Sequence, residues 1–517
     1  MAVDFAVLLG RMSILSLALT ICTRAQDAAA DNGLDGVPII WKTGGVYYTS
    51  RDGAQHRLDL KSQGASPQHR DILVWVDWMA ASNDPVPHKS HQPIPAAIRA
   101  VQTAFAQAPV SNPDGSKGIN LIVIVSPDPV LHMATLGTGT EASIWADFEQ
   151  IKESHLPKEL AGVFHYCLFA HDINVPGSPG TSGIARIGGT DLIVSLGSWV
   201  DPDGNPGNED EQTGTFMHEL GHNLGLQHGG KDAIRYKPNF LSVMNYFFQN
   251  DGLRVPQGSL RFDYSHAALA DLDENDLDET AGMTSGSQFQ GWSTLYFCPG
   301  QWQAIDPPVS IISPIDWNCD GVLTQHVASH ISGPLGSATL TSLMGYDDWG
   351  HVTLKPPTPD AGLPPLITLS VRDETSLSDA NRIPIPPVTG LSAIVVNGKL
   401  RISWNRLPQS RVVGYKITCT DATGKKIVVT TQQTSFEDSI SSNSAARYEV
   451  QGLYRPHGSA NLVKVAKTVA GYGRGLELLN LRDPLPLKNR VPHRGFGHRP
   501  RRVNGISATV DNERFAS

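Results

Sequence analysis

The sequence predicts an α+β domain with a mixed β-sheet, followed by a separate β-sandwich. Three observations lead to this prediction. Two runs typical of buried strands, 71–78 and 119–126, flank a segment with helical spacing of apolar residues, 96–108. A second amphipathic segment, 211–224, follows a loop rich in turn residues. Residues 387–470 contain short alternating runs, as antiparallel strands do.

The first unit is a β-α-β crossover. Residues 71–78 (DILVWVDW) and 119–126 (INLIVIVS) are rich in β-branched and aromatic residues, which favours buried strands. Between them, Ile98, Val101 and Phe105 recur at helical spacing. Because such a crossover joins neighbouring parallel strands, we expect the two strands to lie in one sheet.

Two shorter strands follow the crossover. We expect them at 183–187 and 192–197, with the glycines at 188 and 189 between them. The segment 201–210 (DPDGNPGNED) then consists almost entirely of turn residues, so it predicts a loop that leads into the next helix.

The helix expected over 211–224 has an apolar face that includes Met217 and Leu224. Acidic residues at its start suit the positive end of a helix dipole. Gly225 is expected to end the helix, because the residue after a helix often needs a positive φ that glycine adopts without strain.

The N-terminus predicts an exported chain. Arg11 precedes an apolar run from Met12 to Cys22, which suits a signal peptide and is too short to span a membrane. A buried N-terminal helix is the alternative. A net charge of −9 argues against binding to nucleic acid. We therefore expect a secreted, extracellular protein without a membrane span.

Four cysteines would remain after signal cleavage: Cys167, Cys298, Cys319 and Cys419. So few cysteines in a long chain do not make a disulfide scaffold. Cys298 and Cys319 share one loop-rich stretch, and we expect these two to form a disulfide bond.

One segment carries the chemistry, residues 218–228, which read HELGHNLGLQH. His218 and His222 lie at positions i and i+4, so both imidazoles share one face of the helix. After the helix ends, His228 can return as a third nitrogen ligand. Three protein ligands leave one position open, which is typical of a catalytic zinc site. Glu219 lies close enough to act as a general base on a zinc-activated water.

This pattern resembles the signature of the metzincin metallopeptidases, in which a tight turn containing methionine follows the three histidines. Residues 242–246 (SVMNY) match that turn. The resemblance implies that Met244 forms a hydrophobic floor beneath the histidines. It also implies that Tyr246 is a further zinc ligand or stabilises the oxyanion, as in astacin-like and serralysin-like branches. A tyrosine that only fills the core is the alternative.

The metzincin resemblance covers roughly residues 70–250. It implies a twisted mixed sheet beside an active-site helix. The strand at 182–187 would then be an edge strand that pairs with an extended peptide substrate.

A weaker pattern suggests calcium. Asp316, Asn318 and Asp320 have the spacing that opens a calcium-binding loop, although the expected acidic residue at position 327 is replaced by valine. An Asx-type turn is the alternative. The acidic run 271–279 is interpreted as a solvated face, with a second calcium site as the alternative.

Residues 387–470 resemble a fibronectin type III domain. Trp404 matches the core tryptophan, Tyr415 the following strand and Tyr448 the tyrosine corner. Such modules act as spacers or bind partners, so we expect no catalytic residue here.

A chain of 517 residues is too long for one core, so several units are expected. We divide it into a signal peptide (1–25), an N-terminal segment or short propeptide (26–69), a metzincin-like catalytic domain (70–354), a proline-rich linker (355–386), a fibronectin-like domain (387–470) and a basic disordered tail (471–517).

The predicted function is that of a secreted zinc metalloendopeptidase that hydrolyses peptide bonds in protein or peptide substrates. Its expected cofactor is Zn²⁺, with Ca²⁺ as a candidate second ion. Two alternatives stay open. One is an adhesion or binding protein with a non-catalytic metal site, and the other is a zinc amidase that acts on non-protein substrates.

Overall fold

The computed structural model describes residues 33–81, 89–201, 203–255, 260–298, 301–304, 310–333 and 339–354, and in the C-terminal part 380–381, 385, 388, 390–396, 399–407, 411–421, 423–438, 446–459, 462–464, 467–472, 478–479 and 509–511. The predicted signal peptide lies outside these residues, as do nearly all of the predicted linker and tail. Within the described part, no helix combines the length and the apolar character that a membrane span requires.

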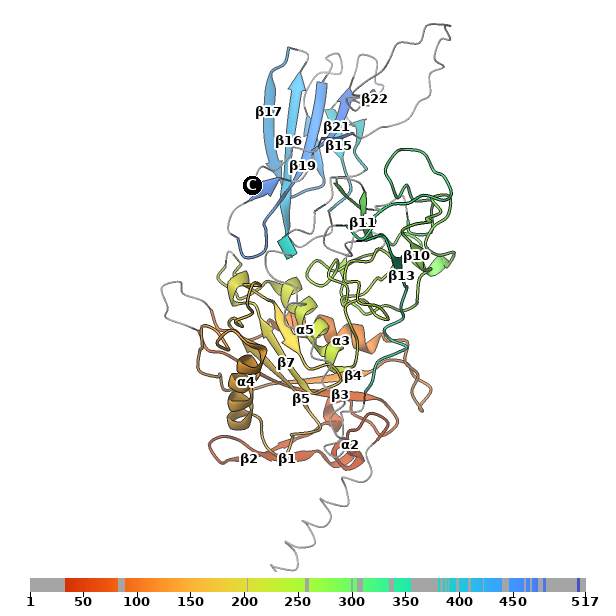
Figure 1. Cartoon of the computed structure of the whole chain (residues 1–517). Coiled ribbons are helices and arrows are strands. Elements are labelled where there is room, and N and C mark those ends of the chain that lie inside the picture. Colours follow the sequence, from red (N-terminus) through yellow and green to blue (C-terminus); the bar gives the residue numbers. More distant parts are fainter. Residues whose placement is uncertain are drawn as a thin grey trace, which may run out of the picture.

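A five-stranded sheet organises the N-terminal half of the molecule (Figure 1). Its strand order is β4-β3-β5-β7-β6, and all neighbours are parallel except the edge strand β6. The strands are β3 (Asp71–Trp78), β4 (Asn120–Val125), β5 (His165–Ala170), β6 (Gly183–Ala185) and β7 (Asp191–Ser195). The structure thus confirms the predicted parallel pair and places the short antiparallel strand at the edge.

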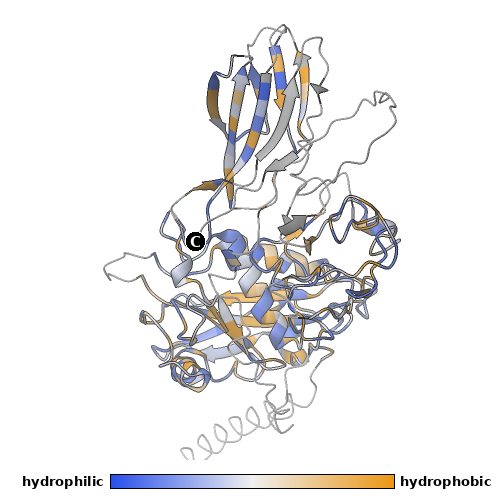
Figure 2. Cartoon of the chain, turned by 45° about the horizontal axis from the view of Figure 1, so that its top comes forward, coloured by the Kyte–Doolittle hydropathy of each residue, from blue (hydrophilic) through white to orange (hydrophobic). Residues whose placement is uncertain are grey.

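Three α-helices accompany this sheet: α3 (Pro95–Ala106), α4 (Glu141–His155) and α5 (Glu209–Asn223). Alternate residues of β3 point to opposite faces, since side chains of a strand alternate. Val74 and Val76 join the core formed with α3 and α5, whereas Leu73 and Trp75 join the core formed with α4. The sheet therefore separates two cores, and Figure 2 shows hydrophobic residues concentrated on its strands.

The sequence analysis made no prediction for α4 or for β5. The helix α4 begins with a capping box, in which the Thr140 hydroxyl accepts a hydrogen bond from the Ser143 backbone N–H. Its buried side chains are widely spaced among polar ones, namely Ile144, Phe148 and Ile151. Their spacing of i, i+4 and i+7 suits a helix, but only these three of its fifteen residues are buried, so little apolar sequence marks it.

Residues 33–69, predicted as an N-terminal segment or short propeptide outside the metzincin-like domain, pack into the same core as β3. Their elements are α2 (Ile39–Gly44), β1 (Val46–Thr49), β2 (Gln55–Leu58) and the short 3-10 helix η1 (Lys61–Gln63). Val37, Val46 and Leu60 belong to the core on the α4 side of the sheet. The buried Lys42 ammonium lies 2.6 Å from Asp35 and 2.8 Å from Asp71, at the start of β3.

The described residues between 250 and 350 are loop-rich, and they share a core with the segment before them that includes Tyr246, Phe247 and Trp317. Their elements are β8 (Leu253–Arg254), β9 (Leu260–Arg261), β10 (Leu272–Asp273), η4 (Ser287–Phe289), β11 (Leu295–Cys298), β12 (Gln301–Ala304) and β13 (Ser342–Leu343). The predicted disulfide between Cys298 and Cys319 is present, with 5.8 Å between the two Cα atoms. Cys167 and Cys419 are buried free thiols.

The C-terminal part is a β-sandwich, as predicted (Figure 1). One sheet has the order β14-β15-β18, and the other contains the path β17-β16-β19-β21-β22 with β20 and β23 attached. The strands are β14 (Ser392–Val396), β15 (Lys399–Ser403), β16 (Val412–Asp421), β17 (Lys426–Thr431), β18 (Ser435–Asp438), β19 (Ala446–Tyr454), β20 (Val463–Lys464), β21 (Lys467–Tyr472), β22 (Leu478–Leu479) and β23 (Thr509–Asp511).

Aromatic residues fill the sandwich where the sequence analysis placed them. The rings of Trp404 and Tyr415 meet edge to face with centroids 5.3 Å apart. The buried Tyr448 hydroxyl donates to an Asp438 carboxylate oxygen at 2.9 Å. The tyrosine thus ties β19 to β18 through a side chain rather than through the backbone.

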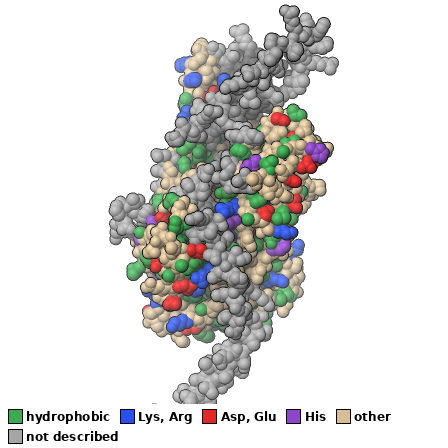
Figure 3. All heavy atoms as spheres, in the orientation of Figure 1, with side chains coloured by type: hydrophobic (Ala, Val, Ile, Leu, Met, Phe, Trp, Pro, Cys, Tyr) green, Lys and Arg blue, Asp and Glu red, His purple; other side chains and the backbone are tan. Residues whose placement is uncertain are grey.

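Charged side chains of both signs are interspersed on the face shown in Figure 3.

Candidate metal centre

The helix α5 begins at Glu209, two residues before the predicted start, because Asn208 caps it. The Asn208 side-chain oxygen accepts hydrogen bonds from the backbone N–H groups of Asp210 and Glu211 at 2.9 and 3.0 Å. In return, the Glu211 carboxylate accepts a bond from the Asn208 N–H at 2.7 Å. This capping box fixes the register of the helix that carries the histidines.

The three predicted histidines meet beside α5. His218 and His222 come from the helix, and the chain returns to His228 after Gly225, whose φ of 92° confirms the predicted helix stop. The Nε2 atom of His222 lies 3.1 Å from that of His218 and 2.9 Å from that of His228. The three side chains are buried, with exposures of 0%, 0% and 5%.

The opposite ring nitrogens face backbone carbonyls. The Nδ1 atom of His218 lies 2.8 Å from the Val243 oxygen, and that of His222 lies 2.9 Å from the Leu226 oxygen. A carbonyl only accepts, so each Nδ1 carries the proton and donates it. The Nε2 lone pairs of His218 and His222 can then both face one shared ion, as in metal-ligating histidines. Burial lowers the pKa of His218 well below its ordinary value. The neighbouring imidazoles of His222 and His228 lower this pKa further.

This donor set fits a transition-metal ion. Zinc binds imidazole nitrogen at about 2.0–2.1 Å, which places the nitrogens of a tetrahedral site roughly 3.3 Å apart. The observed Nε2 separations of 3.1 and 2.9 Å are close to that value. Among the described residues, these three histidines form a group whose ligand atoms lie within 4.8 Å of one another.

Glu219 follows the first histidine and is fully buried. Its carboxylate lies against the edge strand β6, because a carbon placed on Gly183 would come within 2.6 Å of Glu219 Oε1. The glycine therefore leaves the space that this carboxylate occupies. The predicted base and the predicted substrate strand are thus neighbours.

Met244 packs against the helix α5. A carbon placed on Gly221 would be 2.5 Å from the Met244 sulfur, so the glycine allows the thioether to approach α5 just before His222. The preceding residue of this turn, Val243, supplies the carbonyl that holds His218.

Tyr246 also reaches the centre. Its hydroxyl lies 3.1 Å from His228 Nε2 and 3.2 Å from His228 Nδ1, and the two ring centroids are 4.5 Å apart. The side chain is buried, with 4% exposed. Its phenol is therefore placed beside the nitrogen cluster rather than only within the apolar core.

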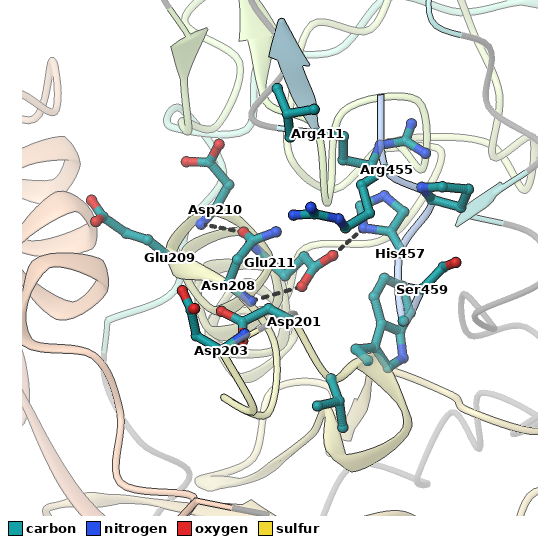
Figure 4. A pocket seen from close by; sticks show the side chains of 15 residues that line it. Asp201, Asp203, Asn208, Glu209, Asp210, Glu211, Arg411, Arg455, His457 and Ser459 are labelled. Atoms are coloured by element: carbon teal, nitrogen blue, oxygen red, sulfur yellow. Dashed lines mark hydrogen bonds and ion pairs between the residues drawn. The ribbon is translucent and has the colours of Figure 1, made fainter. Parts of the chain in front are cut away.

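The sequence analysis missed a junction between the sandwich and the first turn of α5 (Figure 4). The carboxylate of Glu211 contacts His457 Nδ1, and the Arg411 guanidinium binds both Asp251 oxygens at 2.9 and 2.6 Å. Glu211, Arg411 and His457 line a cavity of about 440 Å³. No local pattern predicts such contacts, because their partners are 246 and 160 residues apart in sequence.

Burial controls the protonation of the Glu211–His457 contact. It raises the pKa of Glu211 from 4.5 to about 8. It lowers the pKa of His457 from 6.5 to about 3, and the nearby Arg411 adds to this effect. Near neutral pH the carboxyl therefore keeps its proton and the imidazole stays neutral, so the contact carries no net charge.

This neutral pair predicts a stability plateau between pH 4.5 and 6.5. The contribution of Glu211 to the free energy of unfolding falls as pH rises from 4.5 through 8, because the carboxyl ionises at lower pH in the unfolded chain than in the folded one. The contribution of His457 to the free energy of unfolding falls as pH drops from 6.5 through 3, because the imidazole gains its proton at higher pH in the unfolded chain than in the folded one. Between 4.5 and 6.5 the two slopes cancel.

Thermal unfolding across this pH range tests the prediction. The substitution Glu211→Gln keeps the acceptor for the helix cap and removes the titration, so the fall in Tm above pH 6.5 should become shallower. The same change at the exposed Glu209 of this turn is the control. An identical decline in wild type and Glu211→Gln would contradict the assignment.

The candidate calcium residues form a network of turns. Asp316 accepts from the backbone N–H groups of Asp320 and Gly321, and Asp320 accepts from Asn318 Nδ2 at 3.1 Å. The metal-holding groups found in the described part of the chain are histidine clusters and do not include these carboxylates. A calcium ion at this loop stays a prediction, and the Asx-type turn is the geometry that the structure contains.

Two glutamates of the acidic run 271–279 face inward, so its interpretation as a solvated face is wrong for them. Glu274 and Glu279 are fully buried. Glu274 accepts from the backbone N–H groups of Ile331 and Ser332, and Glu279 accepts from those of Asn318 and Thr324. These carboxylates replace regular secondary structure as partners for buried backbone amides.

No family model matches the chain, and no curated protein matches it in sequence. Three solved structures are similar to parts of it. A fibronectin type III domain of human collagen XX is 23% identical over 16% of this chain and 91% of that one, with a TM-score of 0.13. A two-domain fibronectin type III segment of chicken tenascin is 13% identical over 38% and 97%, with a TM-score of 0.13.

The third structure is wild-type OgpA from Akkermansia muciniphila, which is 9% identical over 80% of this chain and 95% of that one. Its TM-score is 0.18. These scores are too low to identify a fold. This chain's own residues form a buried three-histidine group that could hold a metal ion, beside a buried glutamate and an edge strand.

Proposed function

We propose that this chain is a secreted zinc-dependent endopeptidase of the metzincin type. The observation that carries the proposal is the convergence of three Nε2 atoms beside a buried glutamate that lies against an edge strand. His218, His222 and His228 would hold the ion, and they leave one position open for the reacting groups. A structural zinc site would instead be closed by a fourth protein ligand.

A zinc ion bound there would act as a Lewis acid that polarises a water molecule and the substrate carbonyl. The Glu219 carboxylate takes the proton from the attacking water and passes it to the departing amine. The Tyr246 hydroxyl, beside His228, donates a hydrogen bond to the oxygen that becomes negatively charged.

The edge strand β6 explains why the substrate should be a peptide. An extended peptide can add to the edge of a sheet through main-chain hydrogen bonds. Among the described strands β6 pairs with β7 alone, and its three residues are buried, so a peptide would have to reach it within the fold. Since Gly183 of β6 lies against Glu219, a peptide bond held along β6 would be brought to the base. A non-peptide amide could not use this repeated main-chain pairing.

The proposal is tested by the hydrolysis of casein, an unstructured protein, by the purified chain. Zinc per chain is counted in the wild type and in His222→Asn. We expect cleavage by the wild type only, with one zinc ion fewer in the variant. Treatment with a chelator should stop cleavage, and added zinc should restore it.

Other outcomes favour the two alternatives. Zinc loss in His222→Asn without any casein cleavage by the wild type would favour a binding protein with a non-catalytic metal site. Hydrolysis of small amides without cleavage of peptides would favour a zinc amidase. An equal zinc count in both proteins would contradict the metal centre itself.

The contact between β6 and the base gives a second test. In Gly183→Ala the new methyl group would lie 2.6 Å from Glu219 Oε1 and 2.6 Å from the Ile193 backbone oxygen, so the carboxylate and the pairing of β6 with β7 must both shift. Because displacements of about 1 Å can cost ~100-fold in rate, we expect casein hydrolysis to fall by about that factor. The zinc count should not change. Gly44→Ala, with no atom near its new carbon, is the control, and full activity of Gly183→Ala would refute the placement.

The C-terminal sandwich is proposed to be a fibronectin type III-like module that binds a partner or sets a distance. Its support is the two-sheet topology and the packing of Trp404 against Tyr415. The Cys298–Cys319 disulfide supports export, since disulfides persist mainly in oxidising compartments.

A further inference from the structure

A second group of three histidines lies outside the centre described above. His91, His132 and His171 bring ring nitrogens within 4.8 Å of one another. They are far apart in sequence, and no spacing pattern connects them. The fold alone therefore brings them together.

The three histidines follow neighbouring parallel strands. His171 comes directly after β5, His132 follows β4, and His91 lies on the segment that leads from β3 to α3. The strands β4, β3 and β5 are adjacent in the sheet. The group therefore lies at the carboxyl ends of the parallel strands, which is where open α/β sheets bind ligands.

Backbone bonds around Met79 hold the three segments in register. The Met79 N–H donates to the Phe169 oxygen at 3.0 Å, and the Met79 oxygen accepts from the His91 N–H at 2.9 Å. Met79 also forms a parallel bridge with Val130, two residues before His132. Each histidine is thus fixed by main-chain pairing within a few residues of its Cα atom.

The rings approach one another nearly as closely as those of the first centre. Centroid distances are 5.5 Å for His91–His132, 5.1 Å for His91–His171 and 5.0 Å for His132–His171. In the first centre they lie between 4.7 and 5.0 Å. The Nε2 atom of His91 is 3.0 Å from the Nδ1 atom of His171, near the roughly 3.3 Å expected for two ligands of one tetrahedral zinc ion.

The orientation of His91 also matches that of a ligand. Its Nδ1 atom lies 3.3 Å from the Met79 carbonyl oxygen, which can only accept. The proton therefore resides on Nδ1, and the Nε2 lone pair points toward the other two rings. His218 and His222 use backbone carbonyls in the same way.

We propose that His91, His132 and His171 bind a second divalent transition-metal ion, of which zinc is the representative, at the carboxyl ends of β3, β4 and β5. Three imidazole nitrogens suit zinc and its neighbours rather than calcium or magnesium, which prefer oxygen. His91 is 2% exposed and the His171 side chain 12% exposed, so the site is enclosed but reaches solvent. This assignment does not depend on the proposed peptidase activity.

A hydrogen bond from His171 Nδ1 to His91 Nε2 is the competing explanation of the 3.0 Å contact. It accounts for two rings only. A bound ion would explain why a third loop also delivers an imidazole to the same place. The ion would join the three segments that follow β3, β4 and β5 at the carboxyl ends of these strands. Its removal should therefore lower the stability of this part of the structure.

The experiment is a zinc count per folded full-length chain, measured by mass spectrometry of the metal after dialysis. We expect about two ions in the wild type, about one in His132→Asn, about one in His222→Asn and none in the double variant. His56→Asn, an exposed histidine on β2, is the matched control and should keep both ions. Tm measured with and without zinc shows whether each variant is folded.

A second variant leaves all three ligands in place. A carbon on Gly197 would lie 2.5 Å from the His171 ring, so Gly197→Ala must push that imidazole away from the group. Its zinc count should fall to about one, while His222→Asn removes the other ion independently.

A wild-type count of one, with no further loss in His132→Asn, would overturn the second site. An unchanged count of two in His132→Asn would overturn it as well. Should that variant fail to fold, the counts for the wild type and His222→Asn decide alone, since the proposal requires two and one. Loss of peptidase activity plays no part in this readout, so failure of the proposed function is recognised separately.

Discussion

Replacement of Glu219 by glutamine is expected to lower casein hydrolysis about 100- to 10,000-fold, which is the usual contribution of a general base. Glutamine has nearly the same shape, so the buried space beside Gly183 stays filled. It cannot accept the proton of the attacking water. Because Glu219 is not proposed as a ligand, the zinc count and the Tm should remain those of the wild type.

The matched control is Glu209→Gln, the same substitution at an exposed position in the first turn of the same helix. It should retain wild-type activity. If Glu219→Gln loses zinc, the glutamate acts on the metal site rather than as a base. Full hydrolysis by folded Glu219→Gln would show that another group takes the proton.

Replacement of Gly214 by alanine is expected to lower the Tm by roughly 4–8 °C, which corresponds to a loss of about 2 kcal/mol in the free energy of unfolding. Gly214 lies in the middle of α5. A carbon placed there would come within 1.7 Å of the Gln249 backbone oxygen and within 3.0 Å of the Phe262 ring. The backbone at Gln249, shortly after the methionine turn, must therefore move.

Two opposing effects set the expected loss in the free energy of unfolding of Gly214→Ala. Alanine favours a helix over glycine by about 1 kcal/mol, whereas overpacking a rigid core costs about 1–3 kcal/mol and sometimes more. A backbone oxygen cannot rotate away as a side chain does, so the steric cost should exceed the helical gain.

Gly44→Ala in α2 is the control, because no atom lies within 4 Å of its new carbon. Its Tm should equal or slightly exceed that of the wild type. A Gly214→Ala protein as stable as Gly44→Ala would show that α5 and residue 249 are not packed this closely.

Much of the fold follows from local patterns. The strands at 71–78 and 119–126, the helix between them and the helix that carries the histidines were predicted within a few residues. Each has a strong apolar period or a clear stop, such as Gly225 with its φ of 92°. The short alternating runs of residues 387–470 predicted antiparallel strands for the same reason, and strands such as β15, β16 and β17 lie there.

The helix α4 and the strand β5 were not predicted. The buried residues of α4 are sparse, and β5 (HYCLFA) begins with a histidine whose burial is explained only by its partner. That partner is Asn223 on α5, whose side-chain oxygen lies 3.0 Å from His165 Nδ1. A polar residue inside a strand is understood only once its hydrogen bond is known.

The first metal centre was readable because its ligands lie within eleven residues of one another on one helix and its following turn. Helical geometry fixes the relation of His218 to His222, and the glycine stop lets His228 return. Local rules therefore bring together the three proposed ligands and the proposed base, and the sequence by itself determines the chemistry that we propose.

Only the tertiary structure decides what joins distant segments. The His91–His132–His171 group needs three strands to be placed side by side, and the contacts of Glu211 with His457 and of Asp251 with Arg411 need the sandwich to meet α5. Such pairs have no periodic relation along the chain. Their distances follow from strand order and packing, because residues remote in sequence become neighbours only when the chain has closed on itself.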